Sequence, residues 1–176
     1  MPAKNHLYRW VVVSLVAVTI IGALFYPLKV LLLTDVKRNT GLIIPIRNQA
    51  GFTIEYTHSV NKTKVQEHFV FAPENCFVLT SSTFQSLGVG TPFLPEEGKL
   101  VNDNGVFLLS DINRDFESIT IGFMPMAKQS IFFNQVYYQL EDYFIPGAFI
   151  KIACETMFPI EIIGQILKDG KEVLYD

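Results

Sequence analysis

The sequence contains few charged residues and no cluster of basic ones. Charged residues make up 18% of the 176 residues, below the ~25% that is usual for soluble domains. The formal net charge is −3, and Lys and Arg are scattered along the chain. Binding to a phosphate backbone needs a patch of positive charge. We therefore expect no nucleic-acid partner.

Cysteine is also scarce, because the chain contains only Cys76 and Cys154. Their spacing matches no zinc motif, and the sequence predicts neither a metal site nor a cofactor. Two cysteines can pair in only one way, and an oxidising compartment would allow this disulfide. Two separate buried thiols fit the sequence equally well, so both alternatives stay open.

Acidic residues are absent from the first 34 positions, and the 17 residues from Trp10 to Tyr26 carry no charge at all. At ~1.5 Å per residue, a helix of this length covers most of a ~30 Å hydrocarbon core. Trp10 and Tyr26 bracket the stretch as interfacial aromatic residues do. No good signal-peptidase site follows, and the segment is apolar on every side. The sequence therefore predicts an uncleaved transmembrane signal anchor rather than a cleaved signal or a buried core helix.

These features divide the chain into three parts. Residues 1–9 are expected to form a short cytoplasmic N-terminus, residues 10–27 the transmembrane anchor, and residues 28–176 an extracytoplasmic domain. Basic residues flank the anchor on both sides, so their count does not orient it. The short leading segment places the N-terminus inside. The predicted location is the cell membrane, as a single-pass protein with a periplasmic or cell-surface domain.

After Pro27 the chain consists of short apolar segments separated by turn residues. This pattern predicts an all-β domain, an antiparallel β-sandwich or barrel, preceded by one N-terminal transmembrane helix. At the C-terminus, Lys168-Asp169-Gly170-Lys171 has a hairpin signal. It predicts that the segments 160–167 and 173–175 are paired strands.

One predicted hairpin carries a histidine and a carboxylate. Alternation over 52–60 places His58 on the apolar face of its strand, and alternation over 65–71 places Glu67 on the apolar face of the next. A turn centred on Asn61 to Thr63 would put His58 and Glu67 opposite each other or one step diagonal. The pair could then be a buried structural pair, a binding site or a general acid–base pair.

Other polar residues near this hairpin limit the chemistry that we expect. Ser59 points to the face opposite His58, which makes a Ser-His dyad geometrically poor, so no enzyme activity is predicted. Glu67 and His68 also alternate faces, which argues against a metal set of these two with His58. Gly88 and Gly90 are read as a turn or a close backbone approach. The candidate binding residues are His58, Ser59, Glu67, Gly88 and Gly90.

Taken together, several of these motifs resemble a known prokaryotic family. The motifs are His58-Ser59-Val60, Glu67, Phe84, Ser86 and the run Gly88-Val89-Gly90-Thr91-Pro92. They are similar to the family of domain of unknown function 1850, over roughly residues 28–155. No catalytic residue is established for that family, so the resemblance assigns none here.

The resemblance implies a function. Members of the family are typically small membrane-anchored or exported proteins. Their genes commonly lie beside those of tripartite ATP-independent periplasmic (TRAP) transporters that use a TAXI-type solute-binding protein. We therefore expect an accessory of such a transporter, with its membrane subunits or its solute-binding protein as partners. The alternatives are an envelope ligand-binding module or enzyme that uses His58 and Glu67, and a purely structural envelope protein.

Overall fold

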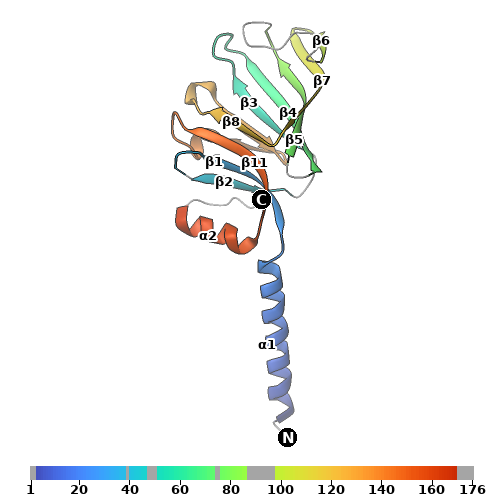
Figure 1. Cartoon of the computed structure of the whole chain (residues 1–176), viewed down its shortest axis with the longest axis vertical. Helices are drawn as coiled ribbons and strands as arrows, with labels where there is room; N and C mark the ends of the chain where they lie inside the picture. Colours follow the sequence, from blue (N-terminus) through green and yellow to red (C-terminus); the bar gives the residue numbers. More distant parts are fainter. Residues whose placement is uncertain (1–2, 39, 47–50, 74–75, 87–97, 170–176) are drawn as a thin grey trace.

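The computed structural model describes residues 3–38, 40–46, 51–73, 76–86 and 98–169, which form two helices and two β-sheets (Figure 1). Helix α1 spans Ala3–Leu24 and helix α2 spans Pro159–Asp169, with short 3-10 helices at Pro125–Ala127 (η3) and Leu140–Asp142 (η4). The strands are β1 (Leu28–Asp35), β2 (Gly41–Pro45), β3 (Phe52–Thr57), β4 (Lys64–Ala72), β5 (Cys76–Phe84), β6 (Lys99–Asp103), β7 (Val106–Phe116), β8 (Ser118–Gly122), β9 (Ser130–Phe133), β10 (Val136–Gln139) and β11 (Phe149–Met157).

The strands form two separate antiparallel sheets. One sheet has four strands in the order β2-β1-β11-β8, and the other has seven in the order β10-β9-β3-β4-β5-β7-β6. The described strand pairs are antiparallel throughout. The prediction of an all-β class is therefore confirmed, and two sheets over a common core correspond to a sandwich rather than a barrel.

The main core lies between the two sheets. Leu31 and Leu33 of β1 are fully buried, and they belong to the same cluster as Phe52 of β3 and Phe69 of β4. The rings of Phe52 and Phe69 stack at 5.0 Å, and Phe77 of β5 meets Phe52 edge-on at 5.2 Å. Residues two apart on a strand share a face, so alternation alone directs these side chains inward.

The seven-stranded sheet also carries a smaller cluster at the end of the hairpin that joins β3 to β4. Val65, Phe84 and Leu109 are buried there, with Phe107 packed against them. The ring of Phe107 stacks on that of Phe84 at 5.8 Å. This second cluster places apolar side chains on both sides of the polar residues described below.

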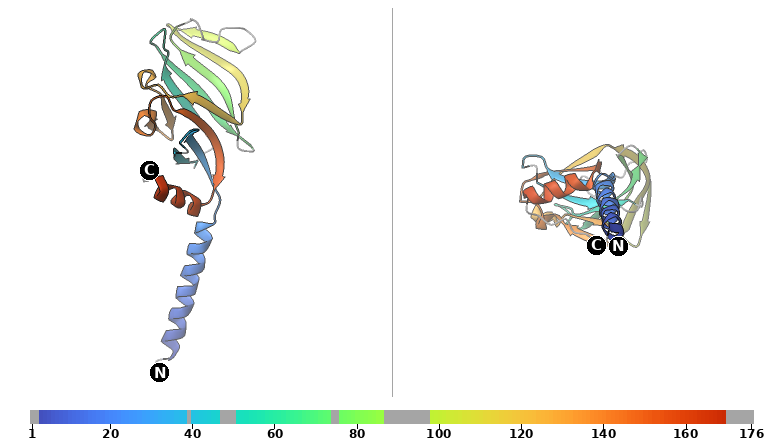
Figure 2. Two further views of the ribbon diagram at one scale, coloured as in Figure 1. Left: turned by 60° about the vertical axis from the view of Figure 1, so that its left-hand side comes forward. Right: turned by 90° about the horizontal axis from the view of Figure 1, so that it is seen from below.

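Helix α1 projects away from the β-domain, and its apolar side chains are exposed (Figures 1 and 2). It begins before the expected anchor and ends at Leu24, three residues before Pro27. Pro27 then leads directly into β1. Among the described residues, no helix combines the length and the hydropathy that a membrane crossing requires.

Helix α2 replaces a strand predicted from the sequence, so that prediction is wrong for 160–167. Pro159 occupies the first position of the helix, where its missing N–H costs nothing. The Glu161 carboxylate accepts the backbone N–H of Phe158 at 2.8 Å, which caps the N-terminus. Ile162 and Ile166 lie four residues apart and pack on Val30 and Ile43 of the four-stranded sheet. Residues 173–175 lie outside the described residues.

Candidate functional site

The hairpin that joins β3 to β4 does not bring His58 and Glu67 together. Thr57 pairs with Lys64 and Ile54 pairs with Glu67. The His58 N–H donates to the Thr63 carbonyl at 2.8 Å, so the loop consists of the four residues 59–62. The turn is therefore centred before Asn61, and the expectation that His58 faces Glu67 is wrong.

His58 instead organises the backbone of this turn. Its Nδ1 accepts the backbone N–H groups of Val60 and Asn61, both at 3.3 Å. Its carbonyl accepts the N–H of Lys62, which adopts a left-handed φ of 55°. Because Nδ1 is an acceptor, the neutral ring carries its proton on Nε2. Ser59 is exposed on the same turn.

Glu67 lies on the inner face of the seven-stranded sheet, in a row of register partners. Ile54 of β3 lies on one side of it and Ser82 of β5 on the other. Ile131 continues the row beyond Ile54, and Leu109 continues it beyond Ser82. Ser82 is 4% exposed, and the three apolar members of the row are buried as well. Two polar residues, the half-buried Glu67 and the buried Ser82, thus lie between apolar neighbours of the same sheet.

Tyr56 is the described hydrogen-bond partner of the Glu67 carboxyl. Its hydroxyl donates to Oε1 of Glu67 over a long 3.4 Å. Burial raises the pKa of Glu67, and the Tyr56 hydrogen bond opposes this only in part. Burial, followed by the charge of Glu67, also raises the pKa of Tyr56, which keeps the phenol proton in place as a donor. The Glu67 carboxyl therefore takes up a proton more easily than an exposed carboxyl does.

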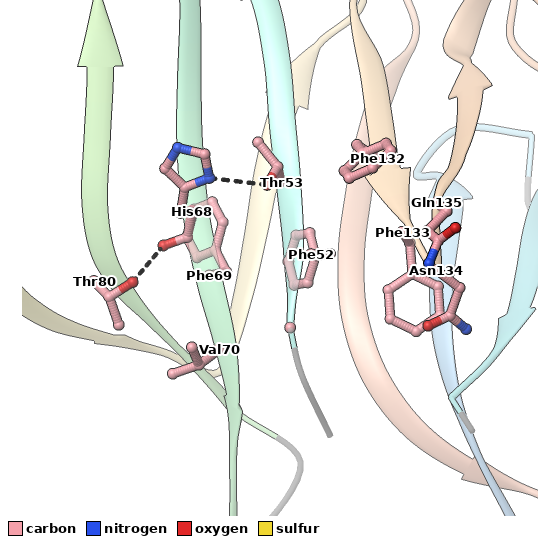
Figure 3. A pocket seen from close by; sticks show the side chains of 11 residues that line it. Phe52, Thr53, His68, Phe69, Val70, Thr80, Phe132, Phe133, Asn134 and Gln135 are labelled. Carbon is pink, nitrogen blue, oxygen red and sulfur yellow. Dashed lines mark hydrogen bonds between the residues drawn. The ribbon is translucent and has the colours of Figure 1, made fainter. Parts of the chain in front are cut away.

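A second cluster lies on the outer face of the same sheet, in a pocket of about 470 Å³ (Figure 3). His68 of β4, Thr53 of β3 and Phe132 of β9 lie side by side there, because Thr53 pairs with both of the others. The amide side chains of Asn134 and Gln135 line one end of the pocket. The pocket therefore combines an imidazole, a hydroxyl and an aromatic surface.

His68 is held in place by two threonines. Its Nδ1 lies 3.0 Å from the Thr53 hydroxyl, and its carbonyl accepts the Thr80 hydroxyl at 3.1 Å. Burial lowers the pKa of His68, so the ring is neutral at pH 7. A neutral imidazole can donate one hydrogen bond and accept another, which suits an uncharged polar ligand group.

A β-bulge and a tight turn shape this pocket. The register of β4 against β5 shifts between His68 and Phe69, where Thr80 is the extra residue. Phe133 pairs with Val136, so Asn134 and Gln135 form a two-residue hairpin loop. Their φ angles of 48° and 67° are both positive, as in a type I′ turn.

The sequence prediction missed this pocket, since it considered His68 only as a neighbour of Glu67 that faces the other way. Alternation does place His68 on the outer face, and the structure agrees. The missing information was the pairing of β3 with β9, which brings Phe132 beside Thr53 from almost 80 residues along the chain.

Other predicted site residues have different outcomes. Gly88 and Gly90 lie outside the described residues. Cys76 opens β5 in the seven-stranded sheet, whereas Cys154 lies in β11 of the four-stranded sheet with its side chain buried. Their pairing stays a prediction. Within the described part of the chain, no group of three or more His, Cys, Asp or Glu side chains could hold a metal ion.

Comparison with known protein families gives a match. A family model described as "Domain of unknown function (DUF1850)" matches residues 52–140, from the start of β3 to the start of η4. The match includes both polar clusters on the seven-stranded sheet. No curated protein and no solved structure shows a significant similarity to the chain.

Proposed function

The chain belongs to the family described as domain of unknown function (DUF1850), and we propose on this basis that it is a membrane-attached accessory protein of a solute transporter. Its β-domain would lie outside the cytoplasm, in the periplasm or at the cell surface. The transporter would be of the TRAP type with a TAXI-type solute-binding protein, as the resemblance implies. The contact would be made with the membrane subunits or with the solute-binding protein.

The observation that carries this proposal is the exposed apolar surface of α1. Side chains on all sides of this helix are exposed, among them Trp10, Val13, Val16, Val18 and Ile21. A helix that is apolar all round buries its surface in lipid or in another protein. The charge-free stretch from Trp10 to Tyr26 is helical as far as Leu24, and this helical part is ~22 Å long at 1.5 Å per residue. It is shorter than a ~30 Å hydrocarbon core, and aromatic residues stand at both ends of the charge-free stretch.

Membrane attachment can be tested by washing membranes with alkaline carbonate, which releases peripheral proteins. We expect the wild-type chain to stay in the pellet. The double variant Val13→Asp/Val16→Asp should move to the supernatant, because each central carboxylate costs about 2.5–3.5 kcal/mol in the bilayer. The matched control is Val13→Leu/Val16→Leu, which should behave like wild type. Release of the wild-type chain by carbonate would contradict the proposal.

The transporter partner needs a separate experiment. The full chain, solubilised together with a TRAP-type transporter of the same cell, should co-purify with the membrane subunits or with the solute-binding protein. A strain that lacks the chain should take up the transported solute more slowly. Uptake at the wild-type rate in that strain, together with no co-purification, would refute the accessory role while leaving membrane attachment intact.

A ligand-binding module is the second candidate function, and the pocket around His68 favours it. The pocket is lined by one neutral imidazole, two threonine hydroxyls and an aromatic side chain. These groups suit a small uncharged polar molecule. A panel of amides, alcohols and sugars can be screened by the melting temperature of the full chain in detergent, because ligand that binds the folded state raises it. The shift should disappear in His68→Ala and persist in Thr120→Ala, an exposed control on β8.

A further inference from the structure

Helix α2 has more apolar surface than the β-domain covers. Ile162 is 1% exposed and packs with Val30 and Ile43, and Ile166 joins the same cluster. Three further apolar side chains face solvent, namely Ile160 at 44%, Ile163 at 43% and Leu167 at 80% exposure. At 3.6 residues per turn they fall within an arc of about 60° beside the buried face. We call these three residues the exposed stripe.

The exposed stripe lies close to the point where α1 meets the β-domain. The ring of Phe158, directly before α2, is 6.5 Å from the ring of Phe25. Leu28, the first residue of β1, packs against the cluster that holds Ile162. Figures 1 and 2 show α2 at the base of the β-domain, beside the end of α1 and lying across its direction. The helix is therefore level with the last residues of the charge-free stretch.

We propose that α2 is a second membrane contact, in which the exposed stripe lies among the lipid headgroups and holds the β-domain against the bilayer. This inference rests on the proposed function, because α1 sets the level of the membrane. An amphipathic helix that lies in the interface buries its apolar side by ~5–10 Å at the boundary of headgroups and acyl chains.

Lipid is the occupant that the position of α2 favours. Phe25 and Tyr26, both exposed, end the apolar stretch of α1 at the level of α2. If α1 is in the bilayer, the covalent connection between α1 and the β-domain keeps the exposed stripe at the membrane surface, at a high effective concentration. The stripe then needs no specific partner to be covered. The polar residues Glu161 and Gln165 lie on the other flank of α2 and face solvent.

The test uses tryptophan fluorescence of the full chain in phosphatidylcholine vesicles. Trp10 is the single tryptophan of the chain, so Trp10→Phe provides a silent background. Ile163→Trp in this background reports on the exposed stripe, and Gln165→Trp reports on the other flank of the same helix. Val106→Trp, at the start of β7 near the far end of the domain (Figure 1), is the distant control.

The vesicles contain lipid that is brominated near the headgroup end of the acyl chain. They should quench the tryptophan fluorescence of Ile163→Trp about two-fold and leave the fluorescence of both control variants unchanged. Flotation of the same vesicles measures attachment by α1 independently. Chains that do not float refute the proposed membrane attachment. Chains that float but show equal emission of Ile163→Trp with and without bromine refute the role of α2 and leave the attachment by α1 intact.

Discussion

The buried carboxylate of Asp35 and the half-buried one of Glu67 show how differently single residues are stabilised in this fold. Asp35 is 1% exposed, and its carboxylate accepts the Lys37 N–H and the Arg38 guanidinium, both at 2.9 Å. These donors lower the pKa of Asp35. Glu67 has Tyr56 as its donor at 3.4 Å, and burial raises the pKa of Glu67. Hydrogen-bond donors, and not burial alone, therefore decide which carboxylate is held in the charged form.

The raised pKa of Glu67 predicts a pH dependence of stability. The unfolded chain loses the Glu67 proton near the ordinary pKa of 4.5, whereas the folded chain keeps it to higher pH. The free energy of unfolding should therefore fall as the pH rises from about 4.5 through the raised pKa of the folded state. In Glu67→Gln this decline should be absent. Urea unfolding at a series of pH values between 4 and 8 measures the difference.

An exposed carboxylate provides the control for this pH series. Glu141→Gln, at an exposed position in η4, should keep the wild-type decline. If the stability of Glu67→Gln and of wild type depended on pH in the same way, the Glu67 carboxyl would not be the cause.

At the scale of single elements, local backbone geometry explains both the pocket hairpin and α2. The turn at Asn134 and Gln135 needs two residues with positive φ, which glycine adopts at least cost. Helix α2 begins with Pro159 and is capped by Glu161. Both elements follow from short-range rules, although neither was recognised in the sequence.

The hairpin turn predicts that Gln135→Gly stabilises the protein by about 0.5–1 kcal/mol, because glycine relieves the left-handed strain at φ 67°. Thermal or urea unfolding measures the gain. The matched control is Gln139→Gly, at the end of β10, where φ is −72° and glycine should cost about 0.5–1 kcal/mol. Equal effects of the two substitutions would show that the turn is not strained.

Neighbouring isoleucines of α2 give the next prediction. Ile162→Ala should lower the free energy of unfolding by about 2–4 kcal/mol, since it leaves a cavity between α2 and the four-stranded sheet. Ile163→Ala should change it by less than about 0.5 kcal/mol in detergent solution, because that side chain is exposed. Both substitutions replace isoleucine by alanine in the same helix, so they change helix propensity equally. A similar loss of stability in both variants would mean that α2 packs on the domain through another face.

At the scale of the whole molecule, the two sheets depend on one core. The buried cluster between them contains side chains from both sheets, including Leu33 of β1 and Ile131 of β9. Neither sheet can bury its apolar face without the other. The β-domain should therefore unfold as one cooperative unit.

Cooperativity can be tested with one variant in each sheet. Leu33→Ala and Ile131→Ala should each lower the stability of the same single transition by about 2–5 kcal/mol. Circular dichroism and near-ultraviolet absorbance should give the same midpoint for each variant. Two separate transitions, of which each variant shifts only one, would show that the sheets fold independently.

Much of the fold follows from patterns in the sequence. Alternation between apolar and polar residues places Phe52 and Ile54 inward and Thr53 outward, because the side-chain period of a strand is two whatever its partners are. The same rule places Glu67 and His68 on opposite faces. Charge-free residues from Trp10 to Tyr26 likewise indicate a long apolar helix, and α1 is found there.

Helix α2 is the case in which sequence periodicity is ambiguous. A short run rich in isoleucine fits a strand as well as one face of a helix. Packing of Ile162 and Ile166 on the four-stranded sheet selects the helix, and the residues that they meet there include Val30 of β1 and Ile43 of β2, from the opposite end of the chain. No local pattern contains this contact.

Periodicity therefore specified which side of each strand faces the core, as a consequence of local backbone geometry. It could not specify register, because a turn centred two residues earlier changes every cross-strand partner while leaving each face the same. That is why Glu67 was correctly placed inward but assigned the wrong neighbour, and why the His68 pocket was missed. The neighbours of Glu67 depend on the register of the β3–β4 hairpin, and the His68 pocket depends on the pairing of β3 with the distant β9. Both are settled only when the whole sheet closes over its shared core.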